Sequence, residues 1–139
     1  MKKAIVIYLS RTGTTMKYAE EIGAYLNTKG IDTQVYSIMQ YKDGVLDHAD
    51  YVLLGCWTSG LMVILQHPEK KWVEFAKRLP SMPETKLALF TTYKILTGSM
   101  FRNMYRKLKG RFAQPALELK SRDSFLSEKN KHDLDQFIT

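Results

Sequence analysis

The feature that most constrains the fold of this chain is a regular alternation of apolar, β-branched runs with amphipathic stretches. The run Ala4–Leu9 is continuously apolar, which is typical of a strand buried on both faces of a sheet. Strands that alternate with helices predict βαβ units, and therefore a parallel sheet covered by helices on both faces. We expect one doubly wound α/β domain over residues 1–139. The five runs that we interpret as strands are Lys3–Leu9, Asp32–Ile38, Asp50–Cys56, Lys86–Thr91 and Gln114–Leu119.

The stretches between these runs carry helical signals. Pro68 suits the first position of a helix, where a missing N–H has no consequence. Ser99 is a good N-cap residue for a later helix. The residues of this helix that we expect to face inward are Phe101, Met104, Tyr105 and Leu108. The helices that we expect are Thr14–Lys29, Pro68–Leu79, Ser99–Leu108 and Ser127–Ile138.

Few residues of this chain are suited to metal binding or to disulfide formation. Cys56 is the single cysteine, so neither an internal disulfide nor a multi-cysteine metal site is expected. The histidines, His48, His67 and His132, lie far apart, and we predict no metal site. We interpret Cys56 as a buried residue at a strand end. No apolar run has the length of a membrane span, and Ala4–Leu9 is too short for the apolar part of a signal peptide, so we expect a cytoplasmic protein.

The most informative loop follows the first predicted strand. It reads Ser-Arg-Thr-Gly-Thr-Thr over residues 10–15 and leads directly into a predicted helix. Hydroxyl groups, a glycine that permits close backbone approach, and the unpaired N–H groups of a helix N-terminus together form an anion site. No Gly-Lys pair is present, so this is not the phosphate loop of nucleotide hydrolases. We predict that the loop binds a phosphate group.

This loop resembles the phosphate loop of the flavodoxin family, which runs Ser/Thr-x-Thr-Gly-x-Thr after the first strand. The match holds at Ser10, Thr12, Gly13 and Thr15. The order of predicted elements agrees over nearly the whole chain. The resemblance implies a flavodoxin-like five-stranded sheet of order 2-1-3-4-5, FMN as the cofactor, and electron transfer as the function. The residues that it places at the phosphate are Ser10, Arg11, Thr12, Gly13, Thr14 and Thr15.

The resemblance also implies that the flavin ring lies between aromatic side chains from the loops after the third and fourth strands. Trp57 stands at the first of these places and Tyr93 at the second. Stacking a flat conjugated ring between them would bury apolar area in a favourable geometry. Thr58 and Gly60 would supply backbone groups near the ring. The alternative for both aromatic residues is a structural role in the core or at its rim.

The charge distribution departs from the usual flavodoxin pattern. The chain carries 21 Lys and Arg against 14 Asp and Glu, a formal net charge of +7. The segment 94–131 carries all of this excess, whereas flavodoxins that serve redox enzymes are typically acidic. A basic site attracts anionic partners. It would also stabilise the reduced, anionic flavin and raise its potential. We therefore expect a redox partner protein or small organic acceptor of acidic character.

Two other functions remain open. One is a flavodoxin-like reductase that acts directly on a quinone or tetrapyrrole, with the apolar stretch 60–65 as a substrate wall. The other is a non-flavin interaction module that uses the basic second half of the chain. A phosphorelay receiver is excluded, because Gly55, Cys56 and Trp57 stand where its phosphoacceptor Asp would be. We do not expect a nucleic-acid partner, since no aromatic and basic recognition motif accompanies the charge.

Overall fold

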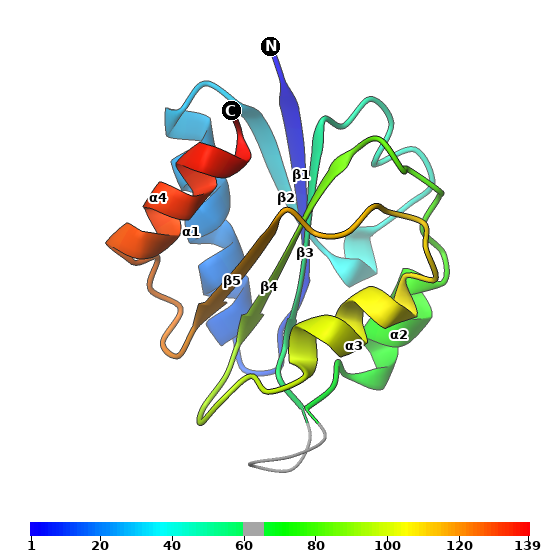
Figure 1. The fold of residues 1–139 in the computed structure, drawn as a ribbon, viewed down its shortest axis with the longest axis vertical. Coiled ribbons are helices and arrows are strands. Elements are labelled where there is room, and N and C mark those ends of the chain that lie inside the picture. The colour runs from blue at the N-terminus through cyan, green and yellow to red at the C-terminus, as the bar shows by residue number, and fades with distance from the viewer. Residues whose placement is uncertain (60–65) are drawn as a thin grey trace.

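The computed structural model describes residues 1–59 and 66–139 and has a central sheet with helices on both faces (Figure 1). Its strands are β1 (Lys3–Leu9), β2 (Asp32–Ser37), β3 (Tyr51–Trp57), β4 (Lys86–Thr92) and β5 (Leu117–Ser121). Its α-helices are α1 (Thr14–Thr28), α2 (Lys70–Ala76), α3 (Met100–Lys107) and α4 (Glu128–Phe137). A short 3-10 helix, η1 (Ile38–Gln40), follows β2.

The strand order is β2-β1-β3-β4-β5, and every neighbouring pair is parallel. This confirms the predicted doubly wound, flavodoxin-like fold. Figure 1 shows α1 and α4 on one face of the sheet and α2 and α3 on the other. The order reverses between β1 and β3, so the connections after these strands lead to opposite faces. A crevice for a ligand opens at such a reversal, beyond the carboxyl ends of the strands.

The core has two layers, one on each face of the sheet. Along β1, Ala4 and Val6 pack into the layer with α1 and α4, while Ile5 and Ile7 pack into the layer with α2 and α3. All four side chains are fully buried, which explains why the apolar run is continuous rather than alternating. Fully burying one aliphatic side chain contributes about 1.5–3 kcal/mol. The buried central strands therefore hold the ends of the loops that follow them in fixed positions.

Gly55 allows an aromatic ring to lie directly against β3. A Cβ atom at this position would overlap the ring of Phe90 on β4. Phe90 in turn meets Tyr18 of α1 edge to face, with 6.0 Å between ring centroids. Any larger residue at position 55 would push this ring away from the sheet, immediately below the carboxyl edge.

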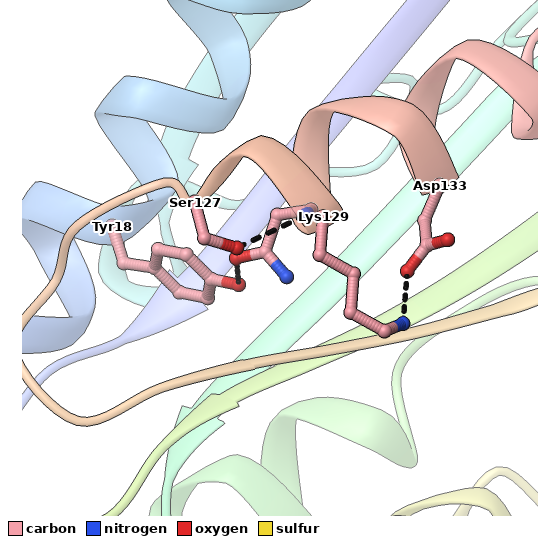
Figure 2. Close-up of polar contacts among 5 residues, drawn as sticks. Tyr18, Ser127, Lys129 and Asp133 are labelled. Carbon is pink, nitrogen blue, oxygen red and sulfur yellow. Dashed lines mark hydrogen bonds and ion pairs between the residues drawn. The ribbon is translucent and has the colours of Figure 1, made fainter.

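Helix α4 is joined to α1 by a buried polar contact (Figure 2). The hydroxyl of Tyr18 donates to Oδ1 of Asn130 over 2.8 Å, and both residues are buried. The backbone N–H of Asn130 donates to Oγ of Ser127, which confirms Ser127 as the N-cap of this helix. Figure 2 also shows the exposed ion pair between Lys129 and Asp133 on the same helix, 2.9 Å long.

Three local predictions were wrong in detail. The last strand begins at Leu117 rather than Gln114 and continues to Ser121, because its pairing with β4 sets its ends. Helix α2 begins at Lys70, after an N-cap in which the Glu69 carboxylate accepts from the Lys71 N–H, so Pro68 precedes the helix.

Helix α3 also differs from expectation at its start. Ser99 occupies the N-cap position, but its hydroxyl donates to the carbonyl of Gln66 instead of capping the helix. Met100 and Met104 are fully buried, whereas Phe101 and Tyr105 are only partly buried. Met104 and Leu108 were predicted to face inward and are fully buried, so the prediction was wrong only in the extent to which Phe101 and Tyr105 are buried and in missing Met100.

Candidate functional site

A pocket of about 470 Å³ opens at the carboxyl edge of the sheet. It lies among the loops that follow β1, β3, β4 and β5, at the edge predicted from the strand order. The pairing of Trp57 with Thr92, and of Thr92 with Ser121, brings the ends of β3, β4 and β5 to one level. The residues that line the pocket are Arg11, Thr12, Thr14, Thr15, Trp57, Thr58, Ser59, Gln66, Thr92, Tyr93, Lys94, Ile95, Leu96 and Arg122.

The loop of residues 10–15, here the 10–15 loop, has the geometry of an anion site. Gly13 has φ of 96°, a left-handed conformation, and its N–H donates to Oγ of Ser10 over 3.0 Å. This bond closes a tight turn directly before α1, where Gly13 is the N-cap. Because the first N–H groups of a helix have no partner within it, those of the first turn of α1 are available to an anion.

The threonine hydroxyls of the 10–15 loop divide between the pocket and the core. Thr12 and Thr14 line the pocket, with 3.5 Å between their Oγ1 atoms. Thr15 is buried, and its hydroxyl bonds Oγ1 of Thr92 on β4 over 2.6 Å. The side chain of Thr15 therefore fixes the start of α1 against the sheet.

Each of the predicted aromatic residues lines the pocket beside a cation. The Arg11 guanidinium lies over the ring of Trp57, 5.1 Å from its centroid. Arg122 lies 5.5 Å and Lys120 5.8 Å from the ring centroid of Tyr93. Contacts of this kind hold the two rings through cation–π attraction.

The segment after β3 is anchored to the end of β4. The Thr58 N–H donates to the Thr92 carbonyl over 2.8 Å, and the Thr58 and Thr91 hydroxyls are 2.8 Å apart. Ser59 and His67 exchange two backbone hydrogen bonds of 3.0 and 2.8 Å. These bonds hold the two ends of the connection that contains Gly60, which itself lies outside the described residues.

The charge of the pocket has one sign. Its lining holds three basic side chains, Arg11, Lys94 and Arg122, and no carboxylate among the residues that the structure describes. Arg122 also donates to the carbonyl of Ile95 over 3.4 Å, which ties the loop after β5 to the loop after β4. An anionic ligand therefore meets complementary charge from three separate loops.

Cys56 is fully buried near the end of β3. Burial raises the pKa of its thiol to about 12, so the thiol stays protonated at neutral pH. A protonated, inaccessible thiol is neither a nucleophile nor a metal ligand. Within residues 1–59 and 66–139, no three His, Cys, Asp or Glu side chains gather in a way that could hold a metal ion.

The structure brings most of the predicted site residues together. Ser10 and Gly13 shape the 10–15 loop rather than lining the pocket. Gly60, and the apolar wall suggested for residues 60–65, lie outside the described residues. The predicted residues that line the pocket are Arg11, Thr12, Thr14, Thr15, Trp57, Thr58 and Tyr93.

Sequence reasoning missed several lining residues, notably Thr92, Ile95 and Arg122. Arg122 was missed because the last strand was predicted to end at Leu119, two positions short of its end at Ser121. Thr92 and Ile95 lie close to Tyr93, which was predicted from the end of the fourth strand. The same strand end could therefore have indicated both of them.

Among the described residues, no helix combines the length and the hydropathy that crossing a bilayer requires.

Fold and site together define a class of protein. It is a doubly wound α/β protein with an anion-binding loop where the strand order reverses, and with two aromatic rings that line the same pocket. Comparison with known proteins makes the class specific. A family model described as flavodoxin matches residues 6–121. The chain therefore belongs to the flavodoxin family, and it is an FMN-binding electron-transfer flavoprotein.

Solved structures share the fold over nearly the whole chain. A flavodoxin from the domain Archaea is 22% identical, with 97% of this chain and 92% of that chain covered and a TM-score of 0.71. Two-electron reduced Megasphaera elsdenii flavodoxin is 21% identical, with 96% of each chain covered and a TM-score of 0.75. A Fusobacterium nucleatum flavodoxin variant bound to flavin mononucleotide is 16% identical, with 99% and 94% covered and a TM-score of 0.65.

Proposed function

We propose that FMN binds in this pocket with its phosphate on the 10–15 loop and its ring beside Trp57 and Tyr93. The observation that carries the proposal is that the loop and both aromatic side chains, from three separate connections, line one pocket. FMN supplies the redox chemistry when it is bound, and the chain supplies binding, orientation and electrostatics.

The residues of the 10–15 loop divide the work of holding the phosphate. The N–H groups of the first turn of α1 donate to the phosphate oxygens, and the Thr12 and Thr14 hydroxyls add further donors. Thr15 positions this turn through its bond to Thr92. Arg11, whose guanidinium lies over the Trp57 ring, is the cation of this loop that would pair with the phosphate.

Trp57, Tyr93 and the apolar side chains of Ile95 and Leu96, in the loop after β4, shield the proposed ring site from water. Thr58 holds the connection after β3 in place through its bonds to β4.

A pair of ligands separates the two halves of the proposed site. Riboflavin has the same ring as FMN and lacks the phosphate. We expect Thr12→Val to weaken FMN binding about tenfold, since a hydrogen bond to a charged group contributes about 1.5–3 kcal/mol, and to leave riboflavin binding unchanged. Trp57→Leu should weaken both ligands. Quenching of flavin fluorescence on titration of the flavin-free protein measures each affinity.

Two results contradict this placement: failure of the chain to bind FMN, or equal effects of Thr12→Val on both flavins.

We also propose that the chain serves as a carrier for a partner protein in the cytoplasm rather than as a reductase that works alone. Steady-state turnover of a quinone or tetrapyrrole by the FMN-loaded protein, without a second protein, would overturn the carrier proposal.

A further inference from the structure

The basic segment 94–131 contains more cations than the two, Lys94 and Arg122, that line the flavin pocket. Two of its lysines, Lys129 and Lys131, form ion pairs on α4. Arg111 donates to the carbonyls of Leu108 and Lys77 and so holds the end of α3. We define the basic face as the exposed side chains of Lys94, Arg102, Arg106, Lys120 and Arg122.

The basic face lies beside the proposed flavin site, because one loop connects them. Residues 94–98, here the 94–98 loop, line the flavin pocket at Lys94, Ile95 and Leu96. At its other end, Gly98 lines a second hollow of about 370 Å³ between α3 and the approach to β5. This second hollow is lined by Gly98, Phe101, Arg102, Tyr105, Gln114, Pro115 and Glu118.

The 94–98 loop exposes apolar side chains in the middle of this charge. Ile95 is 47% and Leu96 38% exposed, although large aliphatic side chains are otherwise mostly buried in this protein. Phe125, after β5, is 62% exposed. Two acidic residues, Glu118 and Asp123, are also exposed in this part of the chain, so the surroundings are mainly basic. Exposed apolar groups with a charged rim are typical of a protein interaction surface.

The cations of the basic face contribute to the fold through few contacts: Arg122 donates to the carbonyl of Ile95, and Arg122 and Lys120 lie over the ring of Tyr93. In the described part of the chain, none of the ion pairs includes a member of this face. Arg102 stands in the first turn of α3, where the helix dipole disfavours a cation, and that turn holds no acidic residue. An unpaired cation kept in an unfavourable position indicates a role outside the folded chain.

We propose that the basic face and the 94–98 loop dock the acidic surface of a redox partner protein beside the flavin. This inference rests on the proposed function, because the docked partner exchanges electrons with FMN in the adjoining pocket. With FMN in its pocket, the second hollow beside the 94–98 loop remains open, and it fits the relief of a protein surface better than the flat layer of lipid headgroups. Carboxylates on the partner would pair with the five cations and speed the encounter.

The soluble domain of cytochrome b5, a small haem protein with an acidic surface, is a suitable probe. Each electron transferred converts one ferric haem to ferrous haem, so two haems are reduced for each fully reduced FMN that returns to its oxidised form. We expect binding to the FMN-free protein by calorimetry, and haem reduction by the reduced FMN-loaded protein in stopped flow. Both should weaken between about 0.01 M and about 0.15 M salt, as the Debye length falls from ~30 Å to ~8 Å. Basic cytochrome c should not bind.

Charge reversal tests the surface. Arg102→Glu with Arg106→Glu should slow association with cytochrome b5 about tenfold or more at low salt. The matched variant, Lys129→Glu with Lys131→Glu, changes the net charge equally on α4 and should change association far less. In the double variant, Arg102→Glu places an anion in the first turn of α3, where it favours the helix, whereas Arg106→Glu places one in the last turn, where it does not. Urea unfolding of both double variants therefore accompanies the association measurement, and slower association at equal stability is assigned to docking.

The outcomes separate this inference from the proposed function. If FMN binds to every variant and both double variants slow cytochrome b5 equally, the basic face is not the docking surface. If the chain binds vesicles of phosphatidylserine in a way that needs Arg102 and Arg106, and does not bind cytochrome b5, a membrane replaces the protein partner and the inference is wrong. Failure of FMN binding alone overturns the proposed function and leaves the calorimetric result to decide the docking surface.

Discussion

Gly13 determines the shape of the 10–15 loop, because its φ of 96° is a conformation that residues with a Cβ adopt only at a cost. We expect Gly13→Ala to lower the free energy of unfolding by about 1 kcal/mol. It should also weaken FMN binding, since relief of the strain turns the loop N–H groups away from the phosphate. Urea unfolding and flavin titration measure the two effects.

Gly30 provides a matched comparison for Gly13. Its φ is 82°, a Cβ there also meets no atom within 4 Å, and it lies at the opposite end of α1. Gly30→Ala should lower stability by a similar amount and leave FMN affinity unchanged. An equal loss of affinity in both variants would mean that general destabilisation, rather than the shape of the loop, weakens binding.

The buried thiol of Cys56 should be unreactive in the folded protein. Its thiol pKa is raised by burial from 9.0 to about 12, so the native protein should resist thiol-alkylating reagents at pH 8 and the urea-unfolded protein should react. Because the folded pKa is the higher one, its contribution to stability is complete below about pH 9. It is lost as the pH rises towards 12, at up to about 1.4 kcal/mol per pH unit.

The same pH dependence can be isolated with Cys56→Ala. This variant should be less stable at pH 7, because it leaves a cavity, but its stability should fall less steeply than that of the parent between pH 9 and pH 11. Parallel pH profiles for parent and variant would show that the thiol does not carry this effect.

At the scale of elements, the contact between α1 and α4 depends on Tyr18 and Asn130. Tyr18→Phe leaves the buried Oδ1 of Asn130 without its 2.8 Å donor, so we expect a loss of about 1–3 kcal/mol in urea unfolding. Tyr25→Phe removes a similar bond between the same helices, from the Tyr25 hydroxyl to Asp135 over 2.7 Å. Because the Asp135 side chain remains 43% exposed and water can replace the bond, this variant should lose less than the first. Equal losses would mean that burial of Asn130 does not matter.

The elements themselves were predictable from the sequence because pattern and burial agree in them. The apolar run of β1 fits a strand buried on both faces, and the alternation of strands with helices predicts the parallel sheet. The ends were less predictable where pairing across the sheet decides them. Lys120 and Ser121 look like loop residues, yet they pair with Thr91 and Thr92. Lys120 stays exposed on this edge strand, and Ser121 is buried with its hydroxyl bonded to the carbonyl of Phe125.

Some residues of the site could be predicted from the sequence and others could not. The 10–15 loop has a local signature, and Trp57 and Tyr93 could be placed from the strand ends. Arg122 could not, because its place in the pocket depends on where β5 ends and on its bond to the carbonyl of Ile95. A long side chain that reaches back across two loops leaves no periodic pattern in the sequence.

At the scale of the whole molecule, the asymmetry of charge is the property that sets this flavodoxin apart. The formal net charge of +7 lies in the segment 94–131, and the fold directs part of it to the flavin pocket through Lys94 and Arg122. A bound flavin that becomes anionic on reduction meets positive potential there. Each nearby cation stabilises that anion by on the order of 1 kcal/mol, which corresponds to a few tens of mV.

Neutralising these cations should therefore lower the potential at which FMN takes up its last electron. We expect Lys94→Gln and Arg122→Gln each to make it more negative, and Arg122→Lys to keep it near the parent value because the charge is retained. Lys129→Gln, which removes an equal charge from the ion pair on α4, should leave it unchanged. Spectroelectrochemical titration at low salt measures these potentials, and added salt should reduce the differences. If the potential follows the net charge rather than the position of the substitution, long-range charge controls the flavin, and the pocket cations have no special part in it.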